Sequence, residues 1–187
     1  MRIIGLDLSL TATGVAIIEI DDGGPFYPRT RTVQSSAAGM GIEGRALRMA
    51  TICNLIEAHV CGFLPSDLVI IEQPAFSRTT GHHHDRSGLW WLAVNRALQH
   101  SCTVVEVTPG GLKKYLTGKG SAGKDEVLLA VARRFPEVDV ANNNEADALG
   151  LAAMGADHLG APLALMPASH RAALDAVAWP ESLAVTS

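Results

Sequence analysis

The stretch IIGLDLSLTATG, residues 3–14, is an apolar run that ends in an acid and is followed by a polar turn. The loose alternation over residues 2–8 predicts a buried strand. Residues 14–20 are apolar and β-branched and predict a second strand, which forms a hairpin with the first around residues 9–13. Asp7 is therefore expected at the end of a core strand, where an unpaired ionised carboxylate is unfavourable.

The rest of the chain alternates predicted helices and strands. We expect a loop over residues 21–28, a third strand over 30–34, a helix over 45–60, a buried parallel strand over 68–71, a loop over 75–84, a helix over 87–100, a strand over 103–107, a short helix over 109–116, a Gly-rich basic loop over 117–123, and helices over 124–135 and 144–158. This order predicts an α/β fold with a mixed sheet. Residues 1–160 are expected to form one domain, and residues 161–187 an appendage with one helix over 168–178.

Composition bounds the class of protein. The chain has 187 residues, 48% of them hydrophobic, which is enough for a real core. No apolar run reaches the roughly 18–20 residues that span a bilayer, and Asp7 interrupts the only N-terminal apolar stretch. We therefore expect a soluble cytoplasmic protein with no membrane partner. Its three cysteines, without a CxxC pair, do not predict a disulfide framework or a cysteine-rich zinc site.

The charge is unevenly distributed. The formal net charge is −4, which by itself disfavours a nucleic-acid partner. Residues 73–124, however, carry a charge of +5, because Asp85 and Glu106 oppose seven basic residues: Arg78, Arg86, Arg96, Lys113, Lys114, Lys119 and Lys124. Such a stretch favours phosphate contact, and ordinary solvated surface charge explains it equally well.

Three acids stand where a purely structural role is awkward. Asp7 and Glu72 each close an apolar strand, and Asp147 lies in the apolar run of the last long helix. Any one of them is explained more simply as a cap or an ion-pair partner. Together they favour a site for Mg²⁺ or Mn²⁺, since carboxylates suit hard cations and a pair of such ions supports phosphodiester hydrolysis. Asn144 shares a helix face with Asp147 and is the expected neutral ligand, whereas Glu145 points elsewhere.

Four stretches together resemble the RuvC family of Holliday-junction resolvases, within the RNase H-like superfamily. They are IIGLDLSLTATG (3–14), VIIEQP (69–74), LTGKGSAGKDEV (116–127) and NEADALGLA (144–152). The resemblance implies an RNase H-like mixed five-stranded sheet flanked by helices. It also implies a homodimer that binds four-way junctions, and other branched DNA, and nicks them with two Mg²⁺ or Mn²⁺ ions per active site.

The resemblance also implies roles for individual residues. Asp7, Glu72, Asp147 and Lys124 would be catalytic, and the metal ligands would be Asp7, Glu72, Asn144 and Asp147. The expected DNA-binding residues are Phe76, Arg78, Lys113, Lys119, Ser121 and Lys124. The chain departs from the family at three points: Asn144 replaces an acid, Phe76 lies one residue further from the glutamate, and GHHHD (81–85) with Trp90–Trp91 is atypical. With these departures, the chain resembles phage members of the family more closely than cellular ones. We therefore expect the protein to act in the cytoplasm of a bacterial or phage-infected cell.

Other interpretations stay open. Asn144 also fits a catalytically weakened branched-DNA-binding paralogue. Residues 7–14 also resemble the phosphate loop of actin-like and sugar-kinase ATPases, although 187 residues leave no room for the two domains of those proteins. The run His82–His84 suits a DNA-facing loop, a solvated loop or, less well, a zinc site. Trp90 and Trp91 cannot both face the core, and one of them suits a subunit interface. Ser9, Thr11 and Thr13 suit either phosphate contacts or turn capping.

Overall fold

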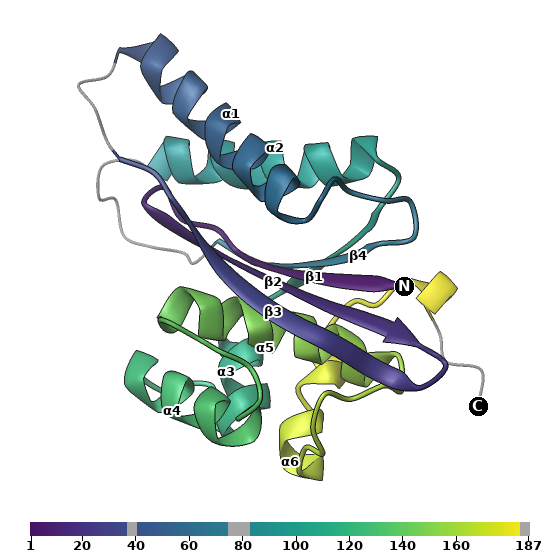
Figure 1. Cartoon of the computed structure of the whole chain (residues 1–187). Helices are drawn as coiled ribbons and strands as arrows, with labels where there is room; N and C mark the ends of the chain where they lie inside the picture. The colour runs from purple at the N-terminus through teal and green to yellow at the C-terminus, as the bar shows by residue number, and fades with distance from the viewer. Residues whose placement is uncertain (37–40, 75–82, 184–187) are drawn as a thin grey trace.

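The computed structural model describes residues 1–36, 41–74 and 83–183 and contains one five-stranded sheet between two layers of helices (Figure 1). The strand order is β3-β2-β1-β4-β5, in which β2 is antiparallel to its neighbours and β1, β4 and β5 are parallel. The strands are β1 (Arg2–Asp7), β2 (Ala12–Asp21), β3 (Gly24–Gln34), β4 (Leu68–Glu72) and β5 (Thr103–Val107). The predicted mixed five-stranded α/β fold is confirmed.

Each face of the sheet has its own hydrophobic core. Side chains alternate along β1, so that Ile3 joins one core and Ile4 and Leu6 join the other. One face is covered by α1 (Ile42–His59) and α2 (His83–Gln99). On the other face lie α3 (Pro109–Thr117), α4 (Lys124–Arg134), α5 (Asn143–His158) and the short α6 (Ala168–Arg171), as Figure 1 shows.

Helix α5 lies unusually close to the sheet, because small residues meet on both sides of the contact. Its sequence is rich in Ala and Gly, and β1 and β2 contribute Gly5 and Gly14 beneath it. A Cβ atom at Gly5 would lie 2.0 Å from the carbonyl oxygen of Ala148, and one at Gly14 would lie 1.9 Å from that of Asn144. Only glycine leaves room at these two positions, so the helix backbone rests directly on the strands.

The structure corrects the predicted loop over residues 21–28. Only Asp22 and Gly23 form a turn, and β3 begins at Gly24, six residues earlier than predicted. Two prolines in this segment argued against a strand, but β3 is an edge strand, where missing N–H donors are tolerated. A register shift opposite Ile17–Glu19 and a positive φ of 47° at Tyr27 accommodate the irregularity. The loop predicted over residues 75–84 lies mostly outside the described residues, and α2 begins at His83.

The C-terminal segment packs against the same core as α5. The single helix predicted over residues 168–178 is broken into α6 and a 3₁₀ turn, Leu174–Ala176. Met166, Ala173 and Leu174 are buried, Arg171 Nε donates to Asp157 Oδ1 at 2.9 Å, and the Trp179 ring stacks on His158 with ring centroids 4.0 Å apart. The division of the chain at residue 160 stays a prediction.

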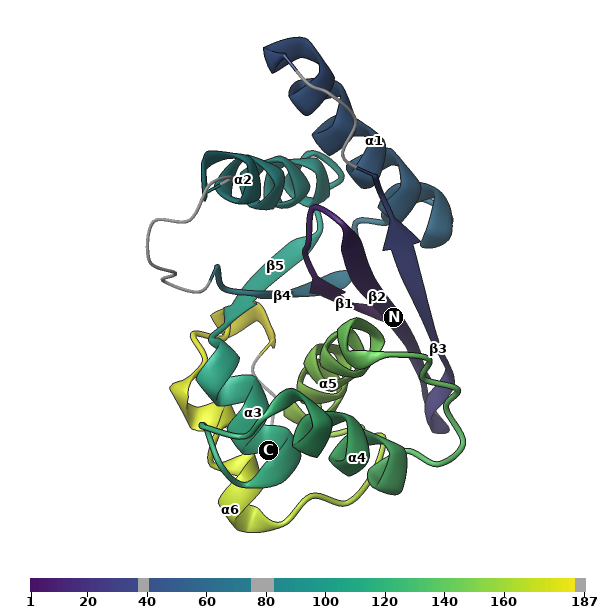
Figure 2. The same cartoon turned by 90° about the vertical axis from the view of Figure 1, so that its left-hand side faces the viewer.

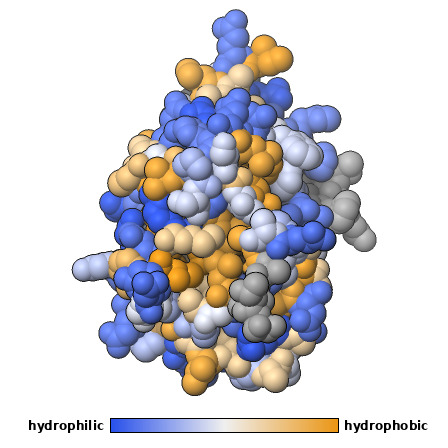
Figure 3. Space-filling view, turned by 90° about the vertical axis from the view of Figure 1, so that its right-hand side faces the viewer, coloured by the Kyte–Doolittle hydropathy of each residue, from blue (hydrophilic) through white to orange (hydrophobic). Residues whose placement is uncertain are grey.

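Figure 3 shows the end of the molecule at which the N-terminus and the C-terminal segment lie, with apolar side chains exposed near the middle of a largely polar face. Within the described ranges, no helix is long and apolar enough to cross a membrane.

The contact at Gly5 gives a first prediction. Gly5→Ala should lower the free energy of unfolding by about 2–3 kcal/mol or more, because the methyl group meets helix backbone that cannot rotate away. Urea unfolding measures the change. Gly110→Ala is the matched control, since its Cβ would meet nothing closer than 3.9 Å, and it should be neutral or slightly stabilising. Equal stability of the two variants would contradict the close contact.

Candidate active site

A cleft of about 340 Å³ opens at the carboxyl ends of β1 and β4. Figure 2 looks toward this end of the sheet, with α2 above it and α4 and α5 below. In open α/β sheets, ligands commonly bind at this edge. The cleft is lined by Asp7, Leu8, Ser9, Glu72, Gln73, Pro74, His83, Arg86, Ser87, Trp90 and Lys124.

Strand geometry brings Asp7 and Glu72 to the same face. The parallel register of β1 and β4 pairs Leu6 with Ile71, so the two acids follow one residue later on adjacent strands. Leu6 and Ile71 both join the core under α1 and α2. Because side chains alternate along a strand, Asp7 and Glu72 both point to the opposite face, toward α5.

The third acid, Asp147, enters from the first turns of α5 and interacts electrostatically with the other two. Burial raises the pKa of Asp7 to about 7, and the charge of Asp147 adds to that rise. Burial also raises the pKa of Glu72 to about 8, with Asp7 and Asp147 contributing, and it raises the pKa of Asp147 to about 6. The three predicted carboxylates therefore share one low-dielectric, mutually repelling environment.

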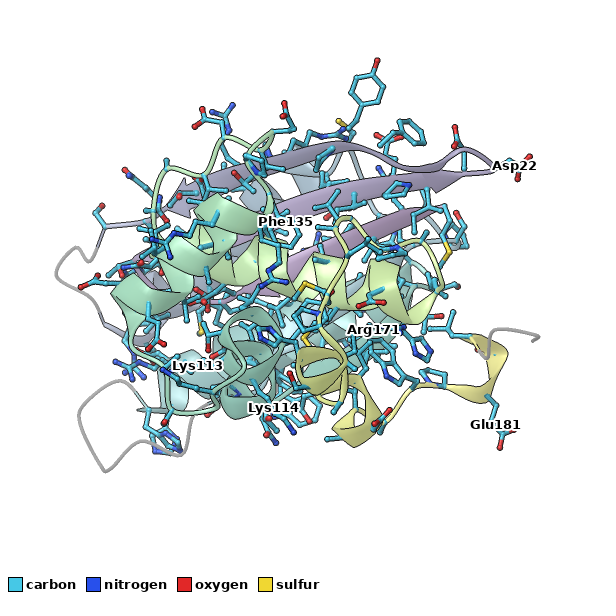
Figure 4. The ribbon with its side chains drawn as sticks, turned by 90° about the horizontal axis from the view of Figure 1, so that it is seen from below. Asp22, Lys113, Lys114, Phe135, Arg171 and Glu181 are labelled. Atoms are coloured by element: carbon cyan, nitrogen blue, oxygen red, sulfur yellow. The ribbon has the colours of Figure 1, made fainter. Side chains whose placement is uncertain are left out.

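Two lysines oppose this accumulation of negative charge. Lys124, the first residue of α4, lowers the pKa of all three acids, and Lys113 of α3 lowers those of Glu72 and Asp147. Figure 4 shows that Lys113 and Lys114 project differently from α3. Lys119 is instead paired with Glu126 at 3.2 Å, and Ser121 is exposed in the loop before α4. Phe76 and Arg78 lie outside the described residues.

The three carboxylates are unpaired in the described part of the chain, where none of them accepts a hydrogen bond or forms an ion pair. Carboxylate oxygen atoms such as theirs are the ligands that Mg²⁺ and Mn²⁺ prefer. Over residues 1–36, 41–74 and 83–183, however, no three His, Cys, Asp or Glu side chains already form a group that could hold an ion. The donors thus fit a hard cation in kind, while their spacing is wider than that of a preformed metal centre.

Glu145 is directed away from the cleft, toward β3. Its carboxylate accepts hydrogen bonds from Thr30 Oγ1 at 2.9 Å, Thr32 Oγ1 at 2.8 Å and the Ala141 N–H at 2.9 Å. Burial alone would raise its pKa, but these hydrogen bonds outweigh burial and lower it. Asn144 is the second residue of α5, its N–H donates to Oδ1 of the N-cap residue Asn142 at 3.0 Å, and it does not line the cleft.

Sequence reasoning missed the contribution of α2 to the cleft. His83, Arg86, Ser87 and Trp90 line it, and the indole N–H of Trp90 donates to the Glu72 carbonyl oxygen at 2.9 Å. The signals in the sequence were the Trp90–Trp91 pair, the histidine run and Arg86, one of the seven basic residues of the positively charged stretch. Trp91 is 66% exposed.

Ser9 and Thr13 cap the turn after β1, since Thr13 Oγ1 donates to the Ser9 carbonyl at 2.8 Å.

Sheet order, helix layers and a carboxylate-lined cleft at the ends of β1 and β4 define an RNase H-like protein with a nuclease-type site. No family model matches the chain. A protein of Gloeobacter violaceus named crossover junction endodeoxyribonuclease RuvC is 30% identical over 160 residues, covering 84% of this chain and 89% of that protein. A protein of the same name from Caldicellulosiruptor saccharolyticus is 27% identical over 158 residues, covering 81% of this chain and 90% of that protein. The chain belongs to the RuvC family.

Solved structures share the fold. Thermus thermophilus RuvC superposes with a TM-score of 0.61 at 20% identity, covering 89% of this chain and all of that one. The same protein in complex with Holliday junction substrate gives a TM-score of 0.63 at 17% identity over the same shares of the two chains. The predicted RNase H-like fold and family are thereby confirmed.

The raised pKa values give a second prediction. A carboxyl whose pKa is higher in the folded than in the unfolded state binds its proton more tightly when folded, so the three acids stabilise the fold at low pH and lose that effect as pH rises from about 4 to about 8. In chelator, their contribution to the free energy of unfolding should therefore fall across this window. The measurement is urea unfolding of wild type and Asp7→Asn at several pH values.

Asp7→Asn removes one ionising acid and its repulsion of Glu72, so the variant should gain stability relative to wild type as pH rises. A stability difference between the two proteins that does not change from pH 5 to pH 8 would contradict the assignment.

Proposed function

We propose that this protein is a divalent-metal-dependent endonuclease that binds four-way DNA junctions and nicks them, with activity on other branched DNA as well. The observation that carries the proposal is a set of three partly buried carboxylates without hydrogen-bond or ion-pair partners among the described residues of a RuvC-family chain. Asp7 and Glu72 line the cleft, and Asp147 does not line it but raises the pKa of both. Relatives are named crossover junction endodeoxyribonuclease, and structural neighbours include a Fowlpox virus resolvase solved with Holliday junction DNA, with a TM-score of 0.50 at 12% identity.

We propose Asp7, Glu72 and Asp147 as ligands of Mg²⁺ or Mn²⁺, with Asn144 as a neutral ligand from the same helix. A pair of such ions, when bound, activates water and stabilises the leaving oxygen. Burial and, for Asp7 and Glu72, repulsion by the neighbouring acids raise the pKa values of the three carboxyls, and bound ions would offset both effects. Since these carboxylates do not yet form a group that could hold an ion within the described residues, the proposal requires them to come together on binding.

The remaining groups of the cleft would act on the DNA itself. Lys124 lowers the pKa of all three carboxyls, and Lys113 lowers those of Glu72 and Asp147, so both lysines are suited to neutralise a phosphate brought to those acids. The Trp90 N–H holds the carbonyl of Glu72 and so restrains the end of β4. Lys119 and Ser121, which do not line the cleft, stay predicted DNA contacts, as do Phe76 and Arg78, which lie outside the described residues. Because the proposed substrate is branched DNA, the proposed location is the cytoplasm of a bacterial or phage-infected cell.

Asp7→Asn should abolish junction cleavage, by at least about 100-fold, while junction affinity stays within about threefold of wild type, because the substitution removes a metal ligand and no phosphate contact. Single-turnover cleavage and a binding titration in chelator measure the two effects. Asp22→Asn is the matched control, since Figure 4 shows Asp22 at the far end of the hairpin, and it should cleave normally. Near wild-type cleavage by Asp7→Asn would refute the metal assignment.

The defining experiment compares a labelled four-way junction with a flap, a fork and linear duplex, with Mg²⁺, with Mn²⁺ and with chelator. Paired symmetric nicks that require metal support a resolvase. Equal cutting of flaps and forks would indicate a general branched-DNA nuclease. Tight junction binding without cutting would favour the weakened paralogue, in which Asn144 disables the site. The ATPase alternative is disfavoured by membership of the RuvC family.

We also propose that the protein is a homodimer that uses the outer surfaces of α1 and α2. Leu47 on α1 is 69% exposed, and Trp91 and Leu98 on α2 are 66% and 54% exposed. Trp91 and Leu98 are seven residues apart and share a helix face. Exposed apolar residues on neighbouring helices are typical of subunit interfaces.

Trp91→Glu should convert the dimer to a monomer at micromolar concentration, because it places a charge in the proposed apolar interface. Sedimentation velocity measures the change. Tyr27→Glu is the matched control, since Tyr27 is 73% exposed on β3, and it should remain dimeric. A Trp91→Glu protein that sediments as wild type would place the interface elsewhere.

A further inference from the structure

The cleft has a second basic wall that the proposed metal chemistry does not use. Lys124 comes from α4, below the sheet, whereas Arg86 comes from α2, above the sheet (Figure 2). Asp7 and Glu72 line the space between these two helices. A ligand that enters the cleft therefore meets cationic side chains from both helical layers.

Arg86 is exposed and has no hydrogen-bond or ion-pair partner within the part of the chain that the structure describes. Two other arginines of the same helical layer are engaged in pairs: Arg45 binds Asp85 at 2.6 Å, and Arg96 binds Glu57. Binding an anion would thus break no existing contact of Arg86 with the described residues.

The start of α2 is anchored on two sides. The buried Asp85, beside Arg86, accepts hydrogen bonds from Arg45 Nε at 3.0 Å and Arg45 Nη2 at 2.6 Å, which joins α2 to α1. One turn later, the Trp90 N–H donates to the carbonyl of Glu72. These contacts hold the first two turns of α2 against α1 and against the end of β4, and so keep Arg86 beside the cleft.

We infer that Arg86 binds a phosphate group of the DNA strand being cut, on the wall of the cleft opposite Lys124. This inference rests on the proposed nuclease function. A phosphodiester that approaches three carboxylates is repelled unless cations accompany it, and a guanidinium binds phosphate oxygens in a bidentate manner that a lysine cannot reproduce. With Lys124 on the other side, Arg86 would fix the strand across the cleft and orient the scissile bond.

The test uses Arg86→Gln, with His84→Gln as the matched control. His84 is exposed on the same helical turn but does not line the cleft. Arg86→Gln should lower the single-turnover cleavage rate about 10- to 100-fold, as expected for loss of one charged phosphate contact. In chelator, the slope of log Kd against log salt should decrease by about 0.9, the value for one lost phosphate contact. Arg86→Lys should restore the salt slope but only part of the rate.

The two readouts separate this inference from the proposed function. If wild type binds junctions without cutting them, the nuclease proposal fails, and the salt slope still decides whether Arg86 contacts phosphate. If wild type binds no branched DNA, both proposals fail. Arg86→Gln that matches His84→Gln in both cleavage rate and salt slope would overturn the assignment of Arg86. Thermal unfolding midpoints within about 2 °C of wild type show that each variant is folded.

Discussion

The backbone contact of α5 with β1 and β2 at Gly5 and Gly14 is the constraint on which the other features depend. It sets the distance between the sheet and the helix that carries Asp147, and therefore the distance between Asp147 and Asp7. A larger residue at either glycine would lift the helix from the strands. The same contact keeps the helix start near β3, where Thr30 and Thr32 bind Glu145. The same packing contact thus places Asp147 near Asp7 and Glu145 against β3.

The acids that are buried in the described part of the chain, Asp67, Asp85, Glu145 and Asp157, all accept hydrogen bonds. Asp67 accepts hydrogen bonds from Arg2 Nη2 at 2.6 Å and from the Leu64 N–H at 2.7 Å, and Asp157 is bound by Tyr115 and Arg171. The carboxylates of the cleft have no such partners among the described residues. Because the other buried charges of the described residues are paired and Asp7, Glu72 and Asp147 are not, unfavourable electrostatic energy is concentrated at these three carboxylates. A bound cation or substrate can release this energy, and that contrast sets the cleft apart from the rest of the interior.

The sequence was sufficient for those features that depend on local pattern. Strand alternation and helical periodicity predicted the positions of β1, β4, β5 and the long helices, and strand ends identified Asp7 and Glu72. The first six residues of β3 were missed because Pro25 and Pro28 suggest a loop. Both prolines are tolerated because β3 lies at the edge of the sheet, and the sequence does not reveal that position. The contribution of α2 to the cleft depends on how two distant segments pack. The basic stretch that contains Arg86 does not indicate which of its residues reaches the cleft, and the Trp90–Glu72 hydrogen bond leaves no local signature. The break in the C-terminal helix likewise reflects packing on α5.

The pairing of the earliest strand with much later segments also constrains how the chain is made. The β1–β2 hairpin forms from adjacent residues. The other edge of β1 pairs with β4, which begins at Leu68, and the face of β1 that packs on α5 is covered only when Ala148 has been synthesised. During synthesis on the ribosome, the hairpin therefore emerges with an open edge and an apolar surface that only the last long helix can cover. Folding is completed after most of the chain has been released. Until then, the unpaired edge and the uncovered apolar surface of the hairpin favour aggregation.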